Sequence, residues 1–386
     1  MKLPFAQRTD KLRSFIAMDV LEESQKLSRQ GEEVINFSIG EPDFPAPLVV
    51  KRAILRSIEK DFTQYTHSLG MPELREAIIK HYQQRYHVKL DIDQILITAG
   101  TSPAMLLIFG ALLNPGDEVI LSDPRYPCYQ NFIEFFDGKI VDVIVREEDG
   151  FQYRPEEVKK KISKKTKAIF LNSPSNPTGC TLSSQVMRKL ASFSPYLISD
   201  EIYHGLTYAG EEHSILEFTD RAFVFNGFSK AYAMTGFRLG YCIFPKEFKE
   251  VMQKMAQNFY ISTSSFIQVA GIAALSKASK DQEKMRRAFA KRRKVMVDGL
   301  KKLGFKITVE PQGAFYVFAN AKHFTKDSYH FAFDLLKKKK VGVTPGIDFG
   351  PSGEGYIRFS YATDIPKIKE GLKRIGEYLE EIKRIK

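Results

Sequence analysis

Short apolar runs alternate with longer amphipathic stretches through the middle of the chain. The runs are rich in Ile, Val and Phe, end at turn residues, and cover residues 94–98, 118–123, 139–145, 167–172, 196–200 and 222–228. This alternation is typical of βαβ units, which build a mainly parallel sheet flanked by helices. The pattern therefore predicts an α/β fold. Because ligands bind beyond the carboxyl ends of the strands in such folds, we expect chemically active residues directly after these runs.

The C-terminal part of the chain has a different pattern. A long helical stretch at residues 280–304 precedes short apolar runs at 305–310, 313–319, 342–346 and 356–362, and a second helical stretch occupies 365–385. This order predicts a smaller α+β domain. Residues 18–31 have the spacing of an amphipathic helix, and we expect the N-terminal segment to pack with that domain. The predicted division is a large domain at 46–282 and a small domain made of 1–45 and 283–386.

The composition excludes several classes of protein. The 386 residues are 43% hydrophobic and 27% charged, as in soluble globular proteins. Residues 1–13 lack the apolar core of a secretory signal, and the longest apolar run, 103–113, is too short to span a membrane. We therefore expect a cytoplasmic protein with no membrane partner. Its three cysteines match neither a disulfide framework nor a zinc knuckle, so we expect no metal site.

The net charge of +12 raises the question of nucleic acid. The lysines gather in helix-like surface runs such as residues 156–167 and 335–340, which favours a solvated face. No motif of a nucleic-acid-binding fold occurs. We expect no nucleic-acid partner.

Small and hydroxyl residues follow the first apolar run. Gly100, Thr101 and Ser102 precede an apolar helical stretch that opens with Pro103. A glycine turn before the free N–H groups of a helix start can bind an anion. An ordinary helix capped by Thr101 or Ser102 explains the same residues, and this stretch taken alone favours that interpretation.

Later runs are followed by groups suited to a planar polar ligand. Tyr126 offers an aromatic face, and Asn176, in a loop rich in Pro and Ser, offers an amide. Asp200 ends the run 196–200, with Tyr203 three residues on. A buried carboxylate requires a cation or a hydrogen-bond donor. Each residue alone also has an ordinary explanation as a turn, a packed tyrosine or a salt bridge.

Two basic residues lie in the small and apolar stretch GFSKAYAMTGFRLG, residues 227–240. A lysine in apolar surroundings loses its proton readily, which makes Lys230 a candidate nucleophile or Schiff-base former. Arg238 is a candidate phosphate ligand. An imine-forming lysine, a phosphate cradle, an aromatic face and a carboxylate for a ring nitrogen together match pyridoxal 5'-phosphate. The combination predicts this cofactor, with Asp200 beside the pyridine nitrogen.

The ordered motifs resemble one family of enzymes. They are FSIGEPDFPAP, YTHSLGMPELREAI, TAGTSPAM, DPRYPCY, NSPSNPTG, SDEIY, GFSKAYAMTGFRLGY, PQGAFYVF and YIRFSYA, and they run in order from about residue 30 to about residue 365. The series is similar to class I/II aminotransferases, pyridoxal-phosphate enzymes of fold type I, and looks most like their bacterial and archaeal aspartate, alanine and aromatic aminotransferase-like subgroup. The resemblance implies a fold type I transferase with large and small domains.

The resemblance also implies a role for each matching residue. Lys230 forms the internal aldimine and Asp200 pairs with the pyridine nitrogen; with Tyr203 these are the expected catalytic residues. The expected ligands of the phenolic oxygen are Asn176 and Tyr203, with Tyr126 stacked on the ring at the substrate side. The expected phosphate ligands are Gly100, Thr101, Ser102, Ser229 and Arg238.

Further residues are implied to bind the substrate and a second subunit. Arg358 clamps the substrate α-carboxylate, helped by Asn176 and the backbone at Gly40. Tyr65 reaches the phosphate of the neighbouring subunit's cofactor, which implies a homodimer with shared active sites.

The implied reaction is ping-pong transamination between an L-amino acid and a 2-oxo acid. The amino acid displaces Lys230, whose freed amine then moves a proton from Cα to the cofactor's C4′ carbon. A carbon–sulfur β-lyase on the same fold stays open as an alternative. A regulator of this fold is disfavoured, because the motifs begin near residue 36 and leave no room for a preceding DNA-binding domain.

Two departures from the family bear on the substrate. Ser102 stands where dicarboxylate-specific relatives often place a lysine, and Tyr126 replaces a tryptophan found in many aspartate enzymes. Phe15, Ile16 and Met18 are apolar candidates for the mouth of the site. These residues favour an amino acid with a neutral or aromatic side chain.

Overall fold

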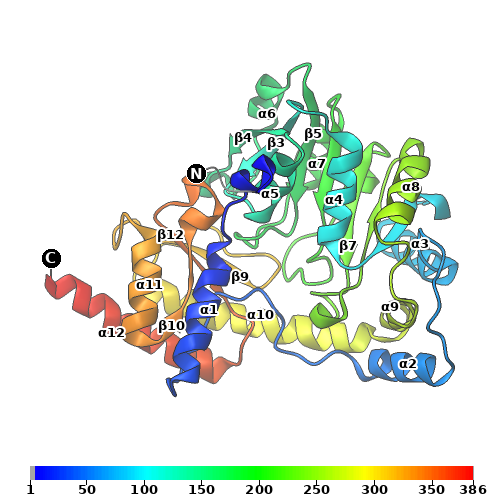
Figure 1. Cartoon of the computed structure of the whole chain (residues 1–386). Coiled ribbons are helices and arrows are strands. Elements are labelled where there is room, and N and C mark those ends of the chain that lie inside the picture. Colours follow the sequence, from blue (N-terminus) through cyan, green and yellow to red (C-terminus); the bar gives the residue numbers. More distant parts are fainter. Residues whose placement is uncertain (1–4, 386) are drawn as a thin grey trace.

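A seven-stranded sheet forms the centre of the protein in a computed structural model that describes residues 5–385. Its strands are β2 (Ile95–Thr98), β3 (Glu118–Asp123), β4 (Lys139–Ile144), β5 (Thr166–Asn172), β6 (Tyr196–Asp200), β7 (Ala222–Gly227) and β8 (Gly240–Ile243). The spatial order is β2-β8-β7-β6-β5-β3-β4, and only β8 runs antiparallel to its neighbours. The predicted mainly parallel α/β sheet is confirmed (Figure 1).

All six predicted central strands form, but the antiparallel strand β8 was missed. It begins at the last residue of the stretch 227–240, which contains Lys230 and Arg238. Its first residue is Gly240, and glycine is depleted in strands. A Cβ at Gly240 would lie 2.8 Å from the backbone carbon of Gly100, so the close approach of the two chains excludes any larger residue there.

Helices cover both faces of this sheet. Successive side chains of a strand point to opposite faces, so strands that are apolar throughout need cover on both sides. In β5, Ala168 and Phe170 pack in one apolar cluster, while Ile169 and Leu171 pack in another. The first cluster includes helices α4 (Thr101–Leu112), α5 (Cys128–Phe135) and α8 (Lys249–Phe259). The second includes α3 (Pro72–Tyr86), α6 (Pro155–Lys161), α7 (Ser184–Ala191) and α9 (Ser265–Lys277), with α2 (Leu48–Glu59) packed against α9. Both faces of the sheet are therefore buried, which explains the nearly continuous apolar runs.

The C-terminal elements build a second, smaller sheet. It has the order β11-β12-β9, formed by β9 (Tyr316–Asn320), β11 (Thr344–Pro345) and β12 (Tyr356–Ser360). Helices α10 (Ser279–Lys302), α11 (Ser328–Lys339) and α12 (Ile365–Ile385) surround it. The apolar run 305–310 forms no strand; only Lys306 bridges to Asn320.

The N-terminal segment lies against these C-terminal elements. Strand β1 (Ile35–Asn36) pairs in parallel with β10 (Val341–Gly342), and α1 (Ile16–Arg29) contacts β10 and β11. The predicted boundary at residue 282 falls inside α10, a continuous helix that runs beneath both sheets in Figure 1. The division at 46–282 stays a prediction.

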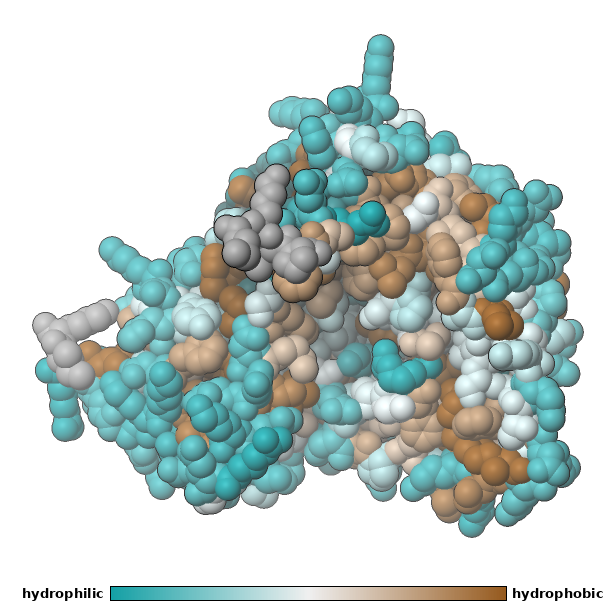
Figure 2. Space-filling view, viewed as in Figure 1, coloured by the Kyte–Doolittle hydropathy of each residue, from teal (hydrophilic) through white to brown (hydrophobic). Residues whose placement is uncertain are grey.

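The face shown in Figure 2 is hollowed between the part built on the large sheet and the part built on α10 to α12. Polar residues line the bottom of this hollow, and apolar residues surround it. Within residues 5–385, no helix is both long and apolar enough to cross a membrane. Residues 1–4, part of the segment used for the signal-peptide prediction, lie outside the described residues.

Candidate active site

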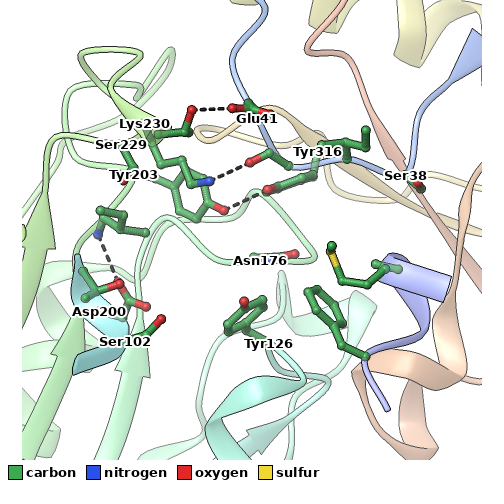
Figure 3. A pocket seen from close by; sticks show the side chains of 18 of the residues that line it. Ser38, Glu41, Ser102, Tyr126, Asn176, Asp200, Tyr203, Ser229, Lys230 and Tyr316 are labelled. Carbon is green, nitrogen blue, oxygen red and sulfur yellow. Dashed lines mark hydrogen bonds between the residues drawn. The ribbon is translucent and has the colours of Figure 1, made fainter. Parts of the chain in front are cut away.

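A cavity of about 340 Å³ lies at the carboxyl ends of β5, β6 and β7. It gathers most of the residues that the sequence nominated (Figure 3). These lining residues are Gly40, Thr101, Ser102, Tyr126, Asn176, Asp200, Tyr203, Ser229, Lys230, Arg238 and Arg358. They come from segments far apart in the chain, so only the fold brings them together.

The amine of Lys230 is held inside the cavity as a weak base. Its Nζ donates a 2.6 Å hydrogen bond to the carbonyl oxygen of Gly40. Burial lowers the pKa of this amine to about 8, and the nearby guanidinium groups of Arg358 and Arg238 act in the same direction, while Glu41 opposes them. At pH 7 about a tenth of the amine is therefore neutral and nucleophilic, far more than for a lysine with the usual pKa.

The carboxylate of Asp200 lies at the end of β6 and is buried. Tyr129 donates a 2.7 Å hydrogen bond to its Oδ2, and the backbone N–H of Ile202 donates to Oδ1 at 3.1 Å. Burial nevertheless raises the pKa of this carboxyl, because these hydrogen bonds offset only part of the desolvation. A cation placed against Asp200 would therefore be strongly favoured.

Sequence reasoning missed Tyr129. It lies in the first turn of α5, three residues after Tyr126, and the two rings meet edge to face at 5.2 Å. A tyrosine at helical spacing from another aromatic residue is indistinguishable from ordinary core packing in the sequence. Only the folded structure shows that its hydroxyl donates to Asp200 at the end of β6.

The start of α4 and the side chain of Arg238 form an anion cradle. Gly100 has φ of +95°, and a Cβ there would lie 2.6 Å from Nη2 of Arg238. Helix α4 begins at Thr101 with Gly100 as its N-cap, and no side chain caps it. The expected caps Thr101 and Ser102 were therefore wrong, because both residues already belong to the helix. Their N–H groups are free for a ligand, which favours the anion-binding interpretation over the ordinary capped helix.

Arg358 is buried, with 1% of its surface exposed. It donates to Oδ1 of Asn176 at 2.8 Å and to Oγ1 of Thr344 at 3.0 Å. Its Nε has no partner among the described residues. Because Asn176 accepts from Arg358 through its oxygen, its amide N–H groups stay available to the cavity. A carboxylate bound here would meet a preoriented guanidinium.

A pair of tyrosines borders the cavity opposite Asn176. The hydroxyls of Tyr203 and Tyr316 are 2.8 Å apart, and the Arg358 guanidinium lies over the Tyr316 ring at 4.5 Å. A Cβ at Gly40 would lie 2.0 Å from the Tyr316 hydroxyl, so a larger residue there would displace this hydroxyl. Tyr316 was not predicted as a site residue, although the motif PQGAFYVF contains it. Burial raises the pKa of Tyr203 well above its usual value.

Three nominated residues do not line the cavity. Gly100 lies next to the Arg238 side chain without lining the cavity, and Ile16 is not among the lining residues. Tyr65 is 79% exposed and also lies outside the cavity of its own chain. Phe15 and Met18 do line it, together with Ala17, Leu21 and Ile39.

The sequence of residues 32–375 matches the family described as aminotransferase class I and II. The chain belongs to this family. Enzymes of class I and II depend on pyridoxal phosphate, and this aminotransferase performs pyridoxal-phosphate-dependent transamination between amino acids and 2-oxo acids.

Relatives of known name cover nearly the whole aminotransferase chain. A (5-formylfuran-3-yl)methyl phosphate transaminase of Methanocaldococcus jannaschii is 40% identical over 95% of this chain and 97% of its own. An aspartate aminotransferase of Pyrococcus horikoshii is 39% identical, over 90% and 91%. The structure of Thermus thermophilus aspartate aminotransferase with maleate is 34% identical, with a TM-score of 0.93 over 97% of this chain and 99% of that one. These names favour transamination over the β-lyase alternative.

The cavity of this aminotransferase fits the cofactor of its family. The anion cradle at Gly100 and Arg238 suits a phosphate, and the buried Asp200 carboxylate lacks the cation that a protonated pyridine would supply. The weakly basic amine of Lys230 suits an aldehyde. All three groups line or adjoin one cavity.

Proposed function

We propose that this aminotransferase takes amino groups from amino acids with apolar side chains, and that Lys230 is the base that moves the reacting proton. The observation that carries the assignment of Lys230 is its amine, with a pKa of about 8, in one cavity with Asp200, Arg238 and Arg358. When bound, pyridoxal phosphate supplies an aldehyde for the substrate amine and a conjugated ring that delocalises electrons from the substrate's α-carbon.

Residues at the strand ends would orient that ring. Asp200, held by Tyr129, would keep a proton on the pyridine nitrogen, because a buried carboxylate is stabilised by an adjacent positive charge. Asn176 and Tyr203 would donate hydrogen bonds to the phenolic oxygen, and Tyr126 would stack on the ring. The proposed phosphate ligands are Gly100, Thr101, Ser102, Ser229 and Arg238.

Lys230 would remove the proton from the substrate's α-carbon and return it on the cofactor side. Its lowered pKa supports this role, because a general base works best when its pKa is near the working pH. Arg358 would hold the α-carboxylate in place, with Asn176 and the backbone at Gly40 beside it. The same groups would serve both half-reactions, so donor and acceptor would use the site in turn.

The wall of the cavity supports an apolar donor. Phe15, Met18 and Ile39 line it, and the Phe15 ring meets Tyr126 edge to face at 5.6 Å. Among the described lining residues the basic ones are Lys230, Arg238 and Arg358, which already have roles. A second carboxylate on the substrate would find Ser102 instead of a lysine, and would lie in a cavity that Glu41 also borders.

A second copy of the chain would complete the site. Exposed apolar residues gather on α2 and near it, where Figure 2 shows apolar surface at the lower right: Leu48, Leu55, Ile58 and Phe62. Tyr65 follows them in the chain, is exposed and does not line its own cavity. Burial of this surface in a homodimer would place Tyr65 at the phosphate of the neighbouring subunit. We also expect the dimer to act in the cytoplasm.

A half-reaction screen tests the proposed donor. The holoenzyme is mixed separately with phenylalanine, leucine and aspartate, and the absorbance of the enzyme-bound cofactor is followed over time. We expect fast loss of absorbance with phenylalanine and leucine and slow loss with aspartate. Aspartate reacting faster by orders of magnitude would overturn the apolar donor, and a lack of reaction with all three amino acids would count against the proposed function as a whole.

A further inference from the structure

The N-terminal segment connects the two parts of the protein across the mouth of the cavity. Its 3-10 helix η1 (Gln7–Lys11) contacts α5 beside the large sheet. The backbone N–H of Arg13 donates to Oδ1 of Asn131, and Nδ2 of Asn131 donates to the carbonyl oxygen of Arg13, both at 3.1 Å. Helix α1 then packs against the C-terminal elements (Figure 1). The turn between η1 and α1 carries Phe15, and the first turns of α1 carry Ala17 and Met18, all of which line the cavity.

Helix α1 has no local cap. Phe15 occupies its N-cap position without a side-chain hydrogen bond, and the Ser14 hydroxyl instead donates to Asp19 at 2.8 and 3.0 Å. The first N–H groups of a helix require acceptors when they are withdrawn from water. Here the acceptor comes from a distant segment: Asp348 accepts from the N–H of Ile16 at 3.0 Å and from the N–H of Ala17 at 3.1 Å, one on each carboxylate oxygen.

Asp348 is itself buried and lies in a short 3-10 helix, η7 (Gly346–Phe349). The next residue, Phe349, faces the guanidinium of Arg358 at 5.0 Å. The carbonyl oxygen of Phe349 accepts from the N–H of Arg125 at 2.9 Å, directly before Tyr126. One short helix thus contacts the start of α1, the proposed carboxylate clamp and the loop that carries Tyr126.

Burying the charge of Asp348 costs free energy. Burial raises the pKa of this carboxyl to about 6, although both backbone hydrogen bonds and the charge of Arg358 oppose the shift and Asp19 adds to it. A residue that served only to fill space would need no charge here.

We propose that Asp348 is a positioning residue that fixes the start of α1 over the cavity and so sets the enzyme's preference for the substrate side chain. This inference rests on the proposed function, because it takes Phe15, Ala17 and Met18 to be the wall that contacts the donor. Asp348 does not line the cavity, and both of its carboxylate oxygens accept from N–H groups of α1. A loosened wall penalises a bulky donor, which contacts it, more than a small donor, which does not.

Two variants remove the anchor from opposite sides. Asp348→Asn replaces one acceptor oxygen with an N–H donor. Ile16→Pro removes the N–H that donates to Asp348, at the first helical position, where proline is well tolerated because Phe15 before it is extended. The control is Asp19→Asn, which removes a neighbouring charge that accepts from Ser14 but from neither anchored N–H.

The measurement is kcat/KM for the half-reaction of the holoenzyme with phenylalanine and with alanine. We expect both anchor variants to lower the ratio of phenylalanine to alanine by about fivefold, the effect of losing one helix cap, and Asp19→Asn to leave it unchanged. A purely structural role would lower both rates together and keep the ratio constant. If Asp348→Asn or Ile16→Pro folds as holoenzyme and keeps the ratio of phenylalanine to alanine of the unmodified enzyme, the inference is rejected. If the unmodified enzyme reacts with neither phenylalanine nor alanine, the proposed function is rejected instead.

Discussion

Tyr129 donates a 2.7 Å hydrogen bond to Asp200 inside the core. The phenol lies in α5 and the carboxylate ends β6, so two elements far apart in the chain share one buried polar contact. This bond opposes the rise in the pKa of Asp200 that burial causes. It therefore favours the ionised form that a protonated pyridine requires.

Tyr129→Phe should slow transamination without releasing the cofactor. Removing a hydrogen bond to a charged group costs about 1.5–3 kcal/mol, so we expect kcat to fall by roughly ten- to a hundredfold. Steady-state kinetics with a fast donor measures the change. The matched control is Tyr153→Phe, another buried tyrosine, whose hydroxyl donates to the backbone of Phe170 away from the cavity. Equal losses in both variants would contradict the role given to Tyr129.

Lys230→Ala should abolish most turnover. A general acid–base group contributes roughly 10²–10⁴-fold, and this variant also loses the amine that binds the cofactor aldehyde. Turnover and cofactor absorbance of the purified variant give the test. Lys246→Ala, which changes an exposed lysine, should leave both unchanged. Near-normal transamination by the Lys230 variant would show that Lys230 has no catalytic role.

Capture of pyridoxal phosphate by the apoenzyme should depend on pH through Lys230. A lysine with its usual pKa of 10.5 stays protonated at neutral pH, whereas this amine, with a pKa of about 8, becomes neutral as the pH rises through 8. Only the neutral amine attacks an aldehyde, so the capture rate should rise with pH and reach half its maximum near 8. Stopped-flow absorbance between pH 6 and 10 measures the capture rate. A rate that keeps rising up to pH 10 would contradict the lowered pKa.

Gly100→Ala should weaken cofactor binding. The substitution places a Cβ 2.6 Å from the Arg238 guanidinium at a backbone φ of +95°. The control is Gly116→Ala, where φ is +84° and no atom lies within 4 Å. Both variants should lose about 1–2 kcal/mol of stability from the left-handed backbone, but only Gly100→Ala should lose cofactor affinity, by about tenfold. Equal affinities in equilibrium titrations would argue against the anion cradle.

Leu55→Asp should dissociate the proposed dimer. Leu55 lies on α2 with 59% of its surface exposed, and a carboxylate in the middle of a buried apolar interface has no partner. Sedimentation should show monomers, and cofactor affinity should fall because Tyr65 no longer reaches the neighbouring phosphate. Tyr329→Asp, at an exposed aromatic residue on α11, is the control. A monomeric unmodified enzyme with full activity would contradict the shared site.

Much of the fold and of the candidate site could be predicted, because neighbouring residues in the sequence specify the strands and the residues at their ends. The alternation of apolar runs predicts the six central strands, since a strand buried on both faces needs apolar residues throughout. Lys230, Asp200 and Asn176 stand at strand ends, and the parallel topology sends those ends to one edge of the sheet. Motif resemblance added Arg358, which no local pattern nominates.

What the sequence left undetermined depends on contacts between distant segments. Tyr129 and Tyr316 cannot be told from core aromatic residues in the sequence, and the glycine at position 240 made strand β8 unrecognisable. Asp348 lies 332 residues from its hydrogen-bond donor Ile16. The sequence by itself determined the class of fold and the family and nominated the candidate site residues, because residue type and spacing carry that information. Only the tertiary structure decided which buried hydroxyl holds Asp200 and which carboxylate anchors α1, because a buried polar group takes whatever partner the packing places within hydrogen-bond distance.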